Sequence, residues 1–346
     1  MNLRNLLKHR NGLYGVLALW IIFFHINRRL GEPIQIPILR QLIESGNIGV
    51  DIFMFFSGCC LYLSMKKKPD VKSFYRKRFI RLIPSYLIIS IPFWFWRSLV
   101  EAPMKGGGFH FIRFFADLSS ATFWLTGIET TWFVFAILAF YLLFPAIFKA
   151  VNKGWKVSLL MLLMVYIVNV IGINFIPIYD KSSIAWTRLP VFMIGVIAGR
   201  YIDSFDLGRF QRSAQIGILS GTAAAVILFL FIFPLNLIFD GERIPSEYMW
   251  LSYGPITVCI VTLLAAILGP LDRRANVIGK ALETIGGISL EMYMSHIIIL
   301  HWFTYYGWLE NVGLWSIIII TGAALAVSCI VQRLNEIILY RIEKRL

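Results

Sequence analysis

The chain has 346 residues and a formal net charge of +14; 58% of its residues are hydrophobic and only 15% are charged. Its mean hydropathy is +0.72. Soluble domains usually contain about 25% charged residues, so this composition excludes an ordinary soluble globular protein. The apolar residues form blocks of roughly 18–22 residues, the length that a helix needs to cross a bilayer. We therefore predict an all-α, polytopic membrane protein in which residues 1–346 form a single transmembrane domain.

Ten apolar segments are predicted to be membrane-spanning helices. In chain order they cover residues 12–27, 47–65, 79–97, 130–148, 156–177, 187–203, 214–234, 249–269, 285–303 and 314–332. If the N-terminus lies in the cytoplasm, 24 of the 33 Lys and Arg residues fall on the inner side, as the positive-inside rule requires. We therefore expect both termini in the cytoplasm, and we attribute the basic charge to membrane topology rather than to nucleic-acid binding.

The first predicted span carries an imidazole near its outer end. Residues 12–24 contain no charged side chain, and His25 closes this apolar run. An ionisable side chain in or beside hydrocarbon costs free energy unless it has a partner or a task. Histidine is also the side chain best suited to proton transfer near neutral pH. His25 is therefore a candidate general base, and the alternative is a histidine that is satisfied at the membrane interface.

Further polar and aromatic side chains are predicted at a similar depth, toward the outer face. They are Asp51 in the second span, Glu129 and Trp132 at the start of the fourth, Arg188 at the start of the sixth and His296 in the ninth. A carboxylate beside a histidine holds one imidazole tautomer, so Asp51 and Glu129 are candidate catalytic partners of His25. The alternatives are structural, namely a favourable helix N-terminal carboxylate for Asp51 and interfacial positions for the others.

The inner end of the third predicted span holds a basic cluster of Arg76, Lys77, Arg78 and Arg81. Arg78 and Arg81 are three residues apart and therefore share one face of a helix. Two guanidinium groups on one face suit bidentate contact with phosphate groups. The alternative is an ordinary positive-inside cluster that binds lipid headgroups.

The sequence predicts no metal site. Its four cysteines, Cys59, Cys60, Cys259 and Cys329, all fall within apolar segments and show no metal-ligand spacing. They are expected to be small packing residues.

Five segments, taken in order, resemble signatures of the acyltransferase family 3 integral membrane proteins, which O-acylate sugars and other acceptors at the cell envelope. The segments are Asn11–His25, Gly49–Gly58, Phe74–Tyr86, Trp132–Pro145 and Ile285–His296. The resemblance covers almost the whole chain, and ten spans is the usual number in this family. The order and spacing of the segments are together more specific than any one of them.

The resemblance implies a donor and a catalytic residue. The donor would be acyl-CoA, most simply acetyl-CoA, supplied from the cytoplasm as a substrate, with no bound cofactor. Arg78 and Arg81, together with Arg76 and Lys77, would bind the phosphate groups of CoA. His25 would act as the general base on the acceptor hydroxyl, or alternatively as a transient carrier of the acyl group.

The resemblance also implies an acceptor, which would be an envelope saccharide presented on the outer side of the bacterial plasma membrane. Trp132 would offer a stacking surface for a sugar ring. His296 and Arg188 are the other candidate acceptor-binding residues. The main alternative is a transporter or flippase of a small polar or glycan substrate, in which the same residues bind but perform no chemistry.

One departure from the family pattern concerns the donor site. The family usually has an Arg eleven residues before the His, and that position is Tyr14 here, with Asn11 in place of the usual Asp. Eleven residues are about 16 Å along a helix, so that Arg would lie near the opposite membrane face from the His. Arg10, one turn before Tyr14, is a candidate replacement, and so is the pair of Arg78 and Arg81. Without a replacement the chain would have an altered donor site or would be a scaffold.

Overall fold

The computed structural model describes residues 3–104 except 32 and 35, and residues 110–127, 131–202, 204, 212–227, 229, 238–239, 242–243, 246–268 and 277–344. Ten longer helices overlap the ten predicted spans. They are α2 (Arg10–Arg29), α4 (Ile48–Lys67), α5 (Val71–Trp96), α9 (Trp132–Val151), α10 (Trp155–Phe175), α13 (Leu189–Arg200), α14 (Arg212–Ile227), α16 (Ser246–Leu268), α18 (Ser289–Tyr305) and α20 (Ser316–Lys344). The prediction of an all-α fold is confirmed for this part of the chain.

Short elements connect these helices. They are α1 (Leu3–Lys8), α3 (Pro37–Glu44), the 3₁₀ turns η1 (Ser45–Asn47) and η6 (Gly313–Trp315), the π-helical turn η2 (Arg97–Glu101), α6 (Ala102–Met104), α7 (Phe111–Leu118), α8 (Ala121–Thr126), α11 (Pro177–Lys181), α12 (Ser183–Trp186), α17 (Val277–Gly287) and α19 (Trp308–Val312). A two-residue antiparallel pair, β1 (Ile238–Phe239) and β2 (Glu242–Arg243), lies before α16.

Six helical segments of the described chain are long and apolar enough to cross a membrane. They are Ile38–Lys67, Val71–Met104, Trp132–Val151, Trp155–Phe175, Glu247–Leu264 and Trp308–Arg341. The helix α2 is not among them; it contains Asn11, His25 and Asn27, and arginines stand at both of its ends. The protein is thus a multi-pass membrane protein, whereas the count of ten spans and the cytoplasmic termini stay predictions.

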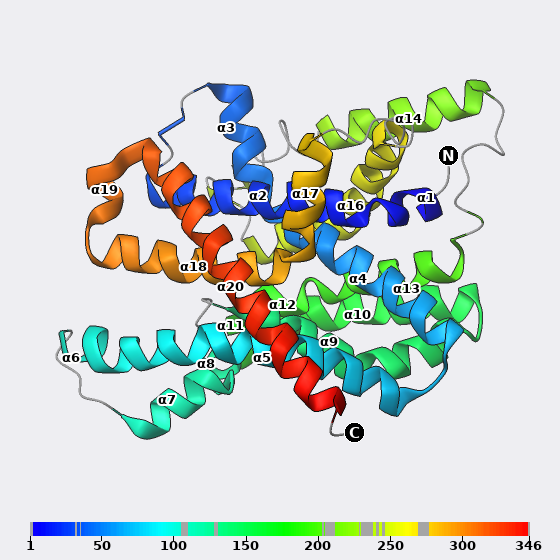
Figure 1. Ribbon diagram of the computed structural model, residues 1–346. Coiled ribbons are helices and arrows are strands. Elements are labelled where there is room, and N and C mark those ends of the chain that lie inside the picture. The colour runs from blue at the N-terminus through cyan, green and yellow to red at the C-terminus, as the bar shows by residue number, and fades with distance from the viewer. Residues whose placement is uncertain are drawn as a thin grey trace.

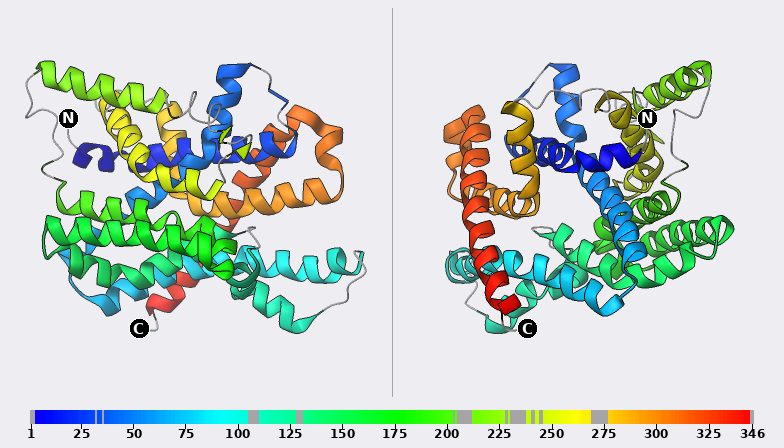
Figure 2. Two further views of the ribbon diagram at one scale, coloured as in Figure 1. Left: turned by 180° about the vertical axis from the view of Figure 1, so that it is seen from behind. Right: turned by 45° about the vertical axis from the view of Figure 1, so that its right-hand side comes forward.

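The functional part of the molecule is formed by α2, α4, α5, α17 and α18. Figure 1 shows α2 and α5 crossing the view in the same direction, from right to left, with α4 returning between them. The helix α2 packs against α17, α18 and α4, and α18 packs in turn against α5 and α20. By contrast, α14 packs mainly against α16 and lies at the edge of the bundle in both views of Figure 2.

Glycines allow the closest helix crossings. A Cβ atom added at Gly195 of α13 would collide with the backbone carbonyl of Phe55 in α4, and one at Gly58 would collide with the carbonyl of Phe192. The same holds where Gly15 of α2 meets α17. Small residues allow this backbone contact, and packing of this kind drives helix association in lipid.

A buried polar network positions α18. Ser85 of α5 donates a hydrogen bond from Oγ to Oε1 of Glu291, over 2.7 Å. Asn335 of α20 donates from Nδ2 to the same Ser85 oxygen, over 2.9 Å. Because all three side chains are buried, these bonds hold the start of α18 against both neighbouring helices.

We predict that Gly195→Ala destabilises the protein by roughly 1–3 kcal/mol, because the added methyl group forces α13 away from α4. The matched control is Gly217→Ala in α14, where a Cβ atom meets nothing within 4 Å. Alanine favours a helix over glycine, so the control is expected to be neutral or stabilising. Thermal unfolding of both variants in detergent is the measurement, and equal midpoints would contradict the close crossing.

Candidate active site

Two cavities lie between the helices and share part of one wall. The first, named here the Arg78 cavity, has a volume of about 420 Å³. The second, the His25 cavity, has a volume of about 660 Å³. The residues Ile21, Val50 and Tyr293 line both cavities. A wall formed by α2, α4 and α18 is therefore common to the two cavities.

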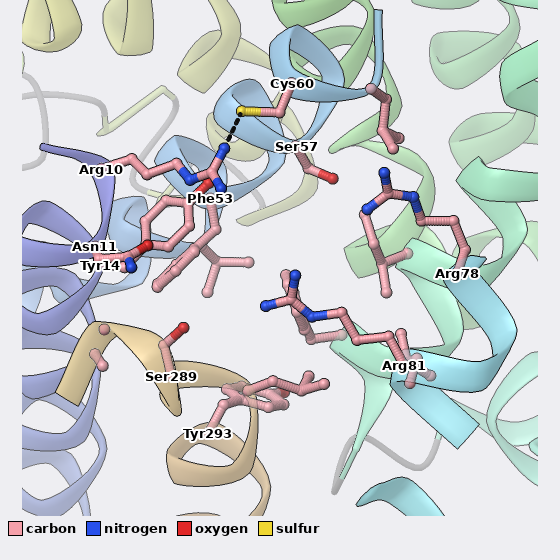
Figure 3. A pocket seen from close by; sticks show the side chains of 18 of the residues that line it. Arg10, Asn11, Tyr14, Phe53, Ser57, Cys60, Arg78, Arg81, Ser289 and Tyr293 are labelled. Carbon is pink, nitrogen blue, oxygen red and sulfur yellow. Dashed lines mark hydrogen bonds between the residues drawn. The ribbon is translucent and has the colours of Figure 1, made fainter. Parts of the chain in front are cut away.

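The Arg78 cavity is lined by three guanidinium groups. Arg78 and Arg81 enter it from α5, and Arg10 enters from α2 on the opposite side, as Figure 3 shows. Arg10 donates a hydrogen bond from Nη1 to Sγ of Cys60, over 3.6 Å. None of the described residues that line this cavity is Asp or Glu. Such a concentration of guanidinium groups is suited to a phosphorylated ligand.

The predicted donor-binding residues divide into two groups. Arg10, Tyr14, Arg78 and Arg81 all line the Arg78 cavity. Arg76 and Lys77 are exposed and are not part of its lining. The divergent Tyr14 thus lies in the same cavity as Arg10, which brings a guanidinium into it from the preceding helical turn.

Two histidines lie at the wall between the cavities, one on each side. His296 of α18 lines the Arg78 cavity and is fully buried, whereas His25 of α2 lines the His25 cavity. The distance from Nδ1 of His25 to Nε2 of His296 is 3.0 Å. The other ring nitrogen of His296, Nδ1, lies 2.8 Å from the carbonyl oxygen of Met292.

These two contacts set the tautomer of both rings. A carbonyl oxygen only accepts, so Nδ1 of His296 carries the proton and donates to Met292. In the neutral ring Nε2 of His296 is then an acceptor, and Nδ1 of His25 must donate to it. This leaves the lone pair of His25 on Nε2. The neutral pair therefore presents a basic nitrogen, which is what a general base requires.

Asp51 is placed beside Arg188 rather than beside His25. Its Oδ1 lies 3.7 Å from Nε of Arg188, and both side chains are buried. The guanidinium carbon of Arg188 also lies 5.3 Å from the ring centroid of Trp132 and 4.5 Å from that of Trp250. The imidazole partner of His25 in the structure is His296, from the group predicted to bind the acceptor.

The other predicted acceptor residues, Trp132 and Arg188, do line the His25 cavity together with His25. Trp132 is only 7% exposed, and one side of its ring is occupied by Arg188. Glu129, predicted as a catalytic carboxylate, lies outside the described residues. No group of His, Cys, Asp and Glu in the described chain could hold a metal ion.

A second polar cluster lies at the His25 cavity and was not predicted from the sequence. The buried Glu101 lies 3.0 Å from Nε2 of His301 and 3.1 Å from Nε of Arg97, measured from its Oε2. Arg97 and His301 both line the cavity. The spacing of Arg97 and Glu101 was a usable signal for their pairing within one helix, but the approach of His301 depends on tertiary packing.

The histidine pair lies between the cationic Arg78 cavity and the His25 cavity. Such an arrangement would allow a chemical group to pass from a ligand in one cavity to a ligand in the other. The model of acyltransferase family 3, described as an acyltransferase domain, matches residues 11–333, so the chain belongs to this family.

A curated relative supports this assignment. The acyltransferase MdmB of Streptomyces mycarofaciens is 30% identical over 126 residues, which cover 33% of this chain and 32% of that protein. The chain thus aligns with about a third of the length of this relative. No solved structure matches the chain.

The contact between Asp51 and Arg188 predicts a stability effect. Asp51→Ala leaves a buried guanidinium without its carboxylate, which is expected to destabilise the protein by roughly 3–5 kcal/mol. In the double variant Asp51→Ala/Arg188→Met much of this loss should be recovered. Thermal unfolding in detergent measures both effects. An Asp51→Ala protein of unchanged stability that loses acyl transfer would instead assign Asp51 to the chemistry.

Proposed function

We propose that this protein is an O-acyltransferase that moves an acetyl group from cytoplasmic acetyl-CoA to a hydroxyl of an envelope saccharide on the outer side of the bacterial plasma membrane. In this proposal residues 1–346 form one domain with both termini in the cytoplasm. The observation that carries it is the contact between His25 and His296 at the wall between two cavities, the first of which is cationic.

The donor would bind in the Arg78 cavity. CoA carries several phosphate groups, and Arg10, Arg78 and Arg81 converge on one chamber without a carboxylate among its described lining residues. Arg10 and His25 are fifteen residues apart on α2, which corresponds to about 22 Å along the helix axis. The long arm of acetyl-CoA would therefore run along α2 and bring its thioester to the histidine pair, while the phosphates stay at the other end.

His25 would act as the general base of the transfer. Its Nε2 takes the proton of the acceptor hydroxyl while the hydroxyl oxygen attacks the thioester carbonyl. The new C–O bond forms, the C–S bond breaks, and the thiolate of CoA receives the proton from the imidazolium. His296 is a positioning residue in this step, because it accepts the Nδ1 hydrogen bond of His25 in the neutral and the protonated form.

A covalent route through the same atoms is the alternative. Nε2 of His25 would attack the thioester, release the thiolate and carry the acetyl group to the acceptor. Both routes need the lone pair on Nε2 of His25, so the tautomer with its proton on Nδ1 supports either route. Transport without chemistry is disfavoured, because the family to which the chain belongs consists of acyltransferases.

We predict that His25→Ala lowers acetyl transfer by at least about 100-fold, because general-base catalysis typically contributes factors of 10²–10⁴. The assay is release of the CoA thiol by purified protein in nanodiscs with acetyl-CoA and acceptor. His110→Ala is the matched control, because His110 is exposed and lines neither cavity. Normal thiol release by His25→Ala at equal protein levels would exclude His25 from the chemistry.

We predict that His296→Ala lowers kcat by about 100-fold, because His25 can then adopt the tautomer with its proton on Nε2. His296→Gln retains an acceptor oxygen and should recover part of the rate. The KM for acetyl-CoA is expected to change little in the Gln variant. A purely structural role for His296 would instead lower the yield of folded protein and leave kcat per folded molecule unchanged.

We predict that Arg10→Gln and the double variant Arg78→Gln/Arg81→Gln each raise the KM for acetyl-CoA by about tenfold or more, since each removes charge-assisted hydrogen bonds to phosphate. Arg76→Gln is the control, because it removes a neighbouring positive charge outside the cavity. An equal rise in KM for Arg76→Gln would indicate general surface attraction rather than binding within the cavity.

A further inference from the structure

The lining of the His25 cavity is strongly basic. Four guanidinium groups face it, from Arg28, Arg29, Arg97 and Arg188. None of the described residues that line it is Asp or Glu. All four belong to the nine Lys and Arg residues that the predicted topology assigns to the outer side. Basic residues are scarce on the outer side of a membrane protein. Their concentration at one cavity therefore indicates a binding site for an anionic ligand.

Two of these four arginines have a carboxylate neighbour that does not line the cavity, and for the other two no such neighbour is found among the described residues. Arg188 lies against Asp51 and Arg97 against Glu101, and Glu101 is shared with His301. The end of α2 carries Arg28 and Arg29, which are exposed and have no carboxylate within ion-pair distance among the described residues. Among its described residues the cavity therefore carries an excess of positive charge where Arg28 and Arg29 line it, and such a cavity concentrates anions.

The helical register links this charge to the reacting atom. Arg28 and Arg29 follow His25 by three and four residues, so they lie on the same side of α2. The distance along the helix axis is about 4.5–6 Å, which is comparable to the width of one sugar ring. An anionic group held by these arginines would therefore place a hydroxyl of the same or the next sugar at Nε2 of His25.

The aromatic residues of the cavity are less available to a sugar. The guanidinium of Arg188 lies between 4 and 6 Å from the ring centroids of both Trp132 and Trp250, at 5.3 Å and 4.5 Å. One side of each ring is thus covered by the arginine. Arg28 and Arg29 are exposed, whereas Trp132 is buried, so these two arginines are more accessible to a ligand than the face of Trp132.

We propose that the acceptor is an anionic saccharide, whose carboxylate or phosphate group binds Arg28, Arg29 and Arg97 while a hydroxyl within one sugar ring of that group meets His25. This inference rests on the proposed function, since it takes His25 as the residue that activates the hydroxyl. It adds the chemical class of the acceptor. The anionic group would contact Arg28 and Arg29 of α2 together with Arg97 of η2, which all line this cavity.

The test uses matched saccharides and the full-length protein in nanodiscs of zwitterionic lipid. Calorimetry compares a galacturonate oligosaccharide with its neutral methyl ester, and a phosphorylated mannose oligosaccharide with its unphosphorylated form. We expect at least one acidic member to bind about tenfold or more tightly than its neutral partner, because hydrogen bonds to charged groups are the stronger ones. The pair that shows the difference identifies carboxylate or phosphate. Equal binding within both pairs, or no binding in either, overturns the proposal.

Variants assign the effect to the cavity. Arg28→Gln and Arg29→Gln, made singly, should each reduce the preference for the acidic member, and Arg29→Lys should retain more of it than Arg29→Gln. Arg113→Gln is the control, because Arg113 is exposed on α7 and does not line the cavity. If Arg113→Gln reduces the preference as much as the cavity variants do, the proposal is overturned.

Two further measurements separate the remaining explanations. The first concerns lipid binding. If the protein shows no preference for acidic saccharides in zwitterionic nanodiscs, and the arginines instead bind the headgroups of phosphatidylglycerol, the cavity is a lipid-binding site. That result overturns the proposal. Addition of acetyl-CoA to the same samples distinguishes a failure of the proposed function from a failure of the proposed acceptor class. Acid-specific binding without thiol release overturns the proposed function alone, whereas equal thiol release with acidic and neutral acceptors overturns the acceptor class alone.

Discussion

The hydrogen bond between His25 and His296 is the interaction on which the rest of the site depends. It joins α2 to α18 at the wall between the two cavities, and its geometry decides which nitrogen of His25 is basic. The carbonyl of Met292 contributes from within α18 by fixing the proton on the far side of His296. Two imidazoles and one backbone carbonyl thus replace the carboxylate that commonly orients a catalytic histidine.

The surrounding fold holds this contact in place. Glycine at position 15 lets α2 approach α17 closely, and the network of Ser85, Glu291 and Asn335 ties the beginning of α18 to α5 and α20. Both histidines are therefore carried by helices whose positions are set by packing against several neighbours. In the proposed reaction, a base held in this way would lose little freedom when the substrates bind, which favours proton transfer.

The two cavities have a common electrostatic design. Each is lined by several arginines and, among its described residues, by no carboxylate, while the wall between them contains Ile21, Val50 and Tyr293. In the proposed reaction the charged parts of both substrates would remain in their own cavities. Only the acetyl group would pass the wall, so no phosphate would have to enter the hydrocarbon region and no ATP would be consumed.

The fold class and one face of the Arg78 cavity could be predicted from the sequence, because helical spacing alone puts Arg78 and Arg81 together. Depth along the helices also grouped His25 with residues that line the same cavity. It did not give the rotation of each helix, and so it could not tell that Asp51 faces Arg188 while His296 faces His25. Such side-by-side contacts depend on tertiary packing, which no local pattern in one sequence encodes.

The proposed chemistry depends on the tautomer of His25, which nitrogen NMR of the protein labelled with ¹⁵N-histidine measures. The signal of His25 is assigned by its loss in His25→Ala. We expect a neutral His25 ring with its proton on Nδ1 and a measurable nitrogen–nitrogen coupling to Nε2 of His296. A neutral His25 ring with its proton on Nε2, and no coupling to His296, would exclude the hydrogen bond from Nδ1 of His25 to His296.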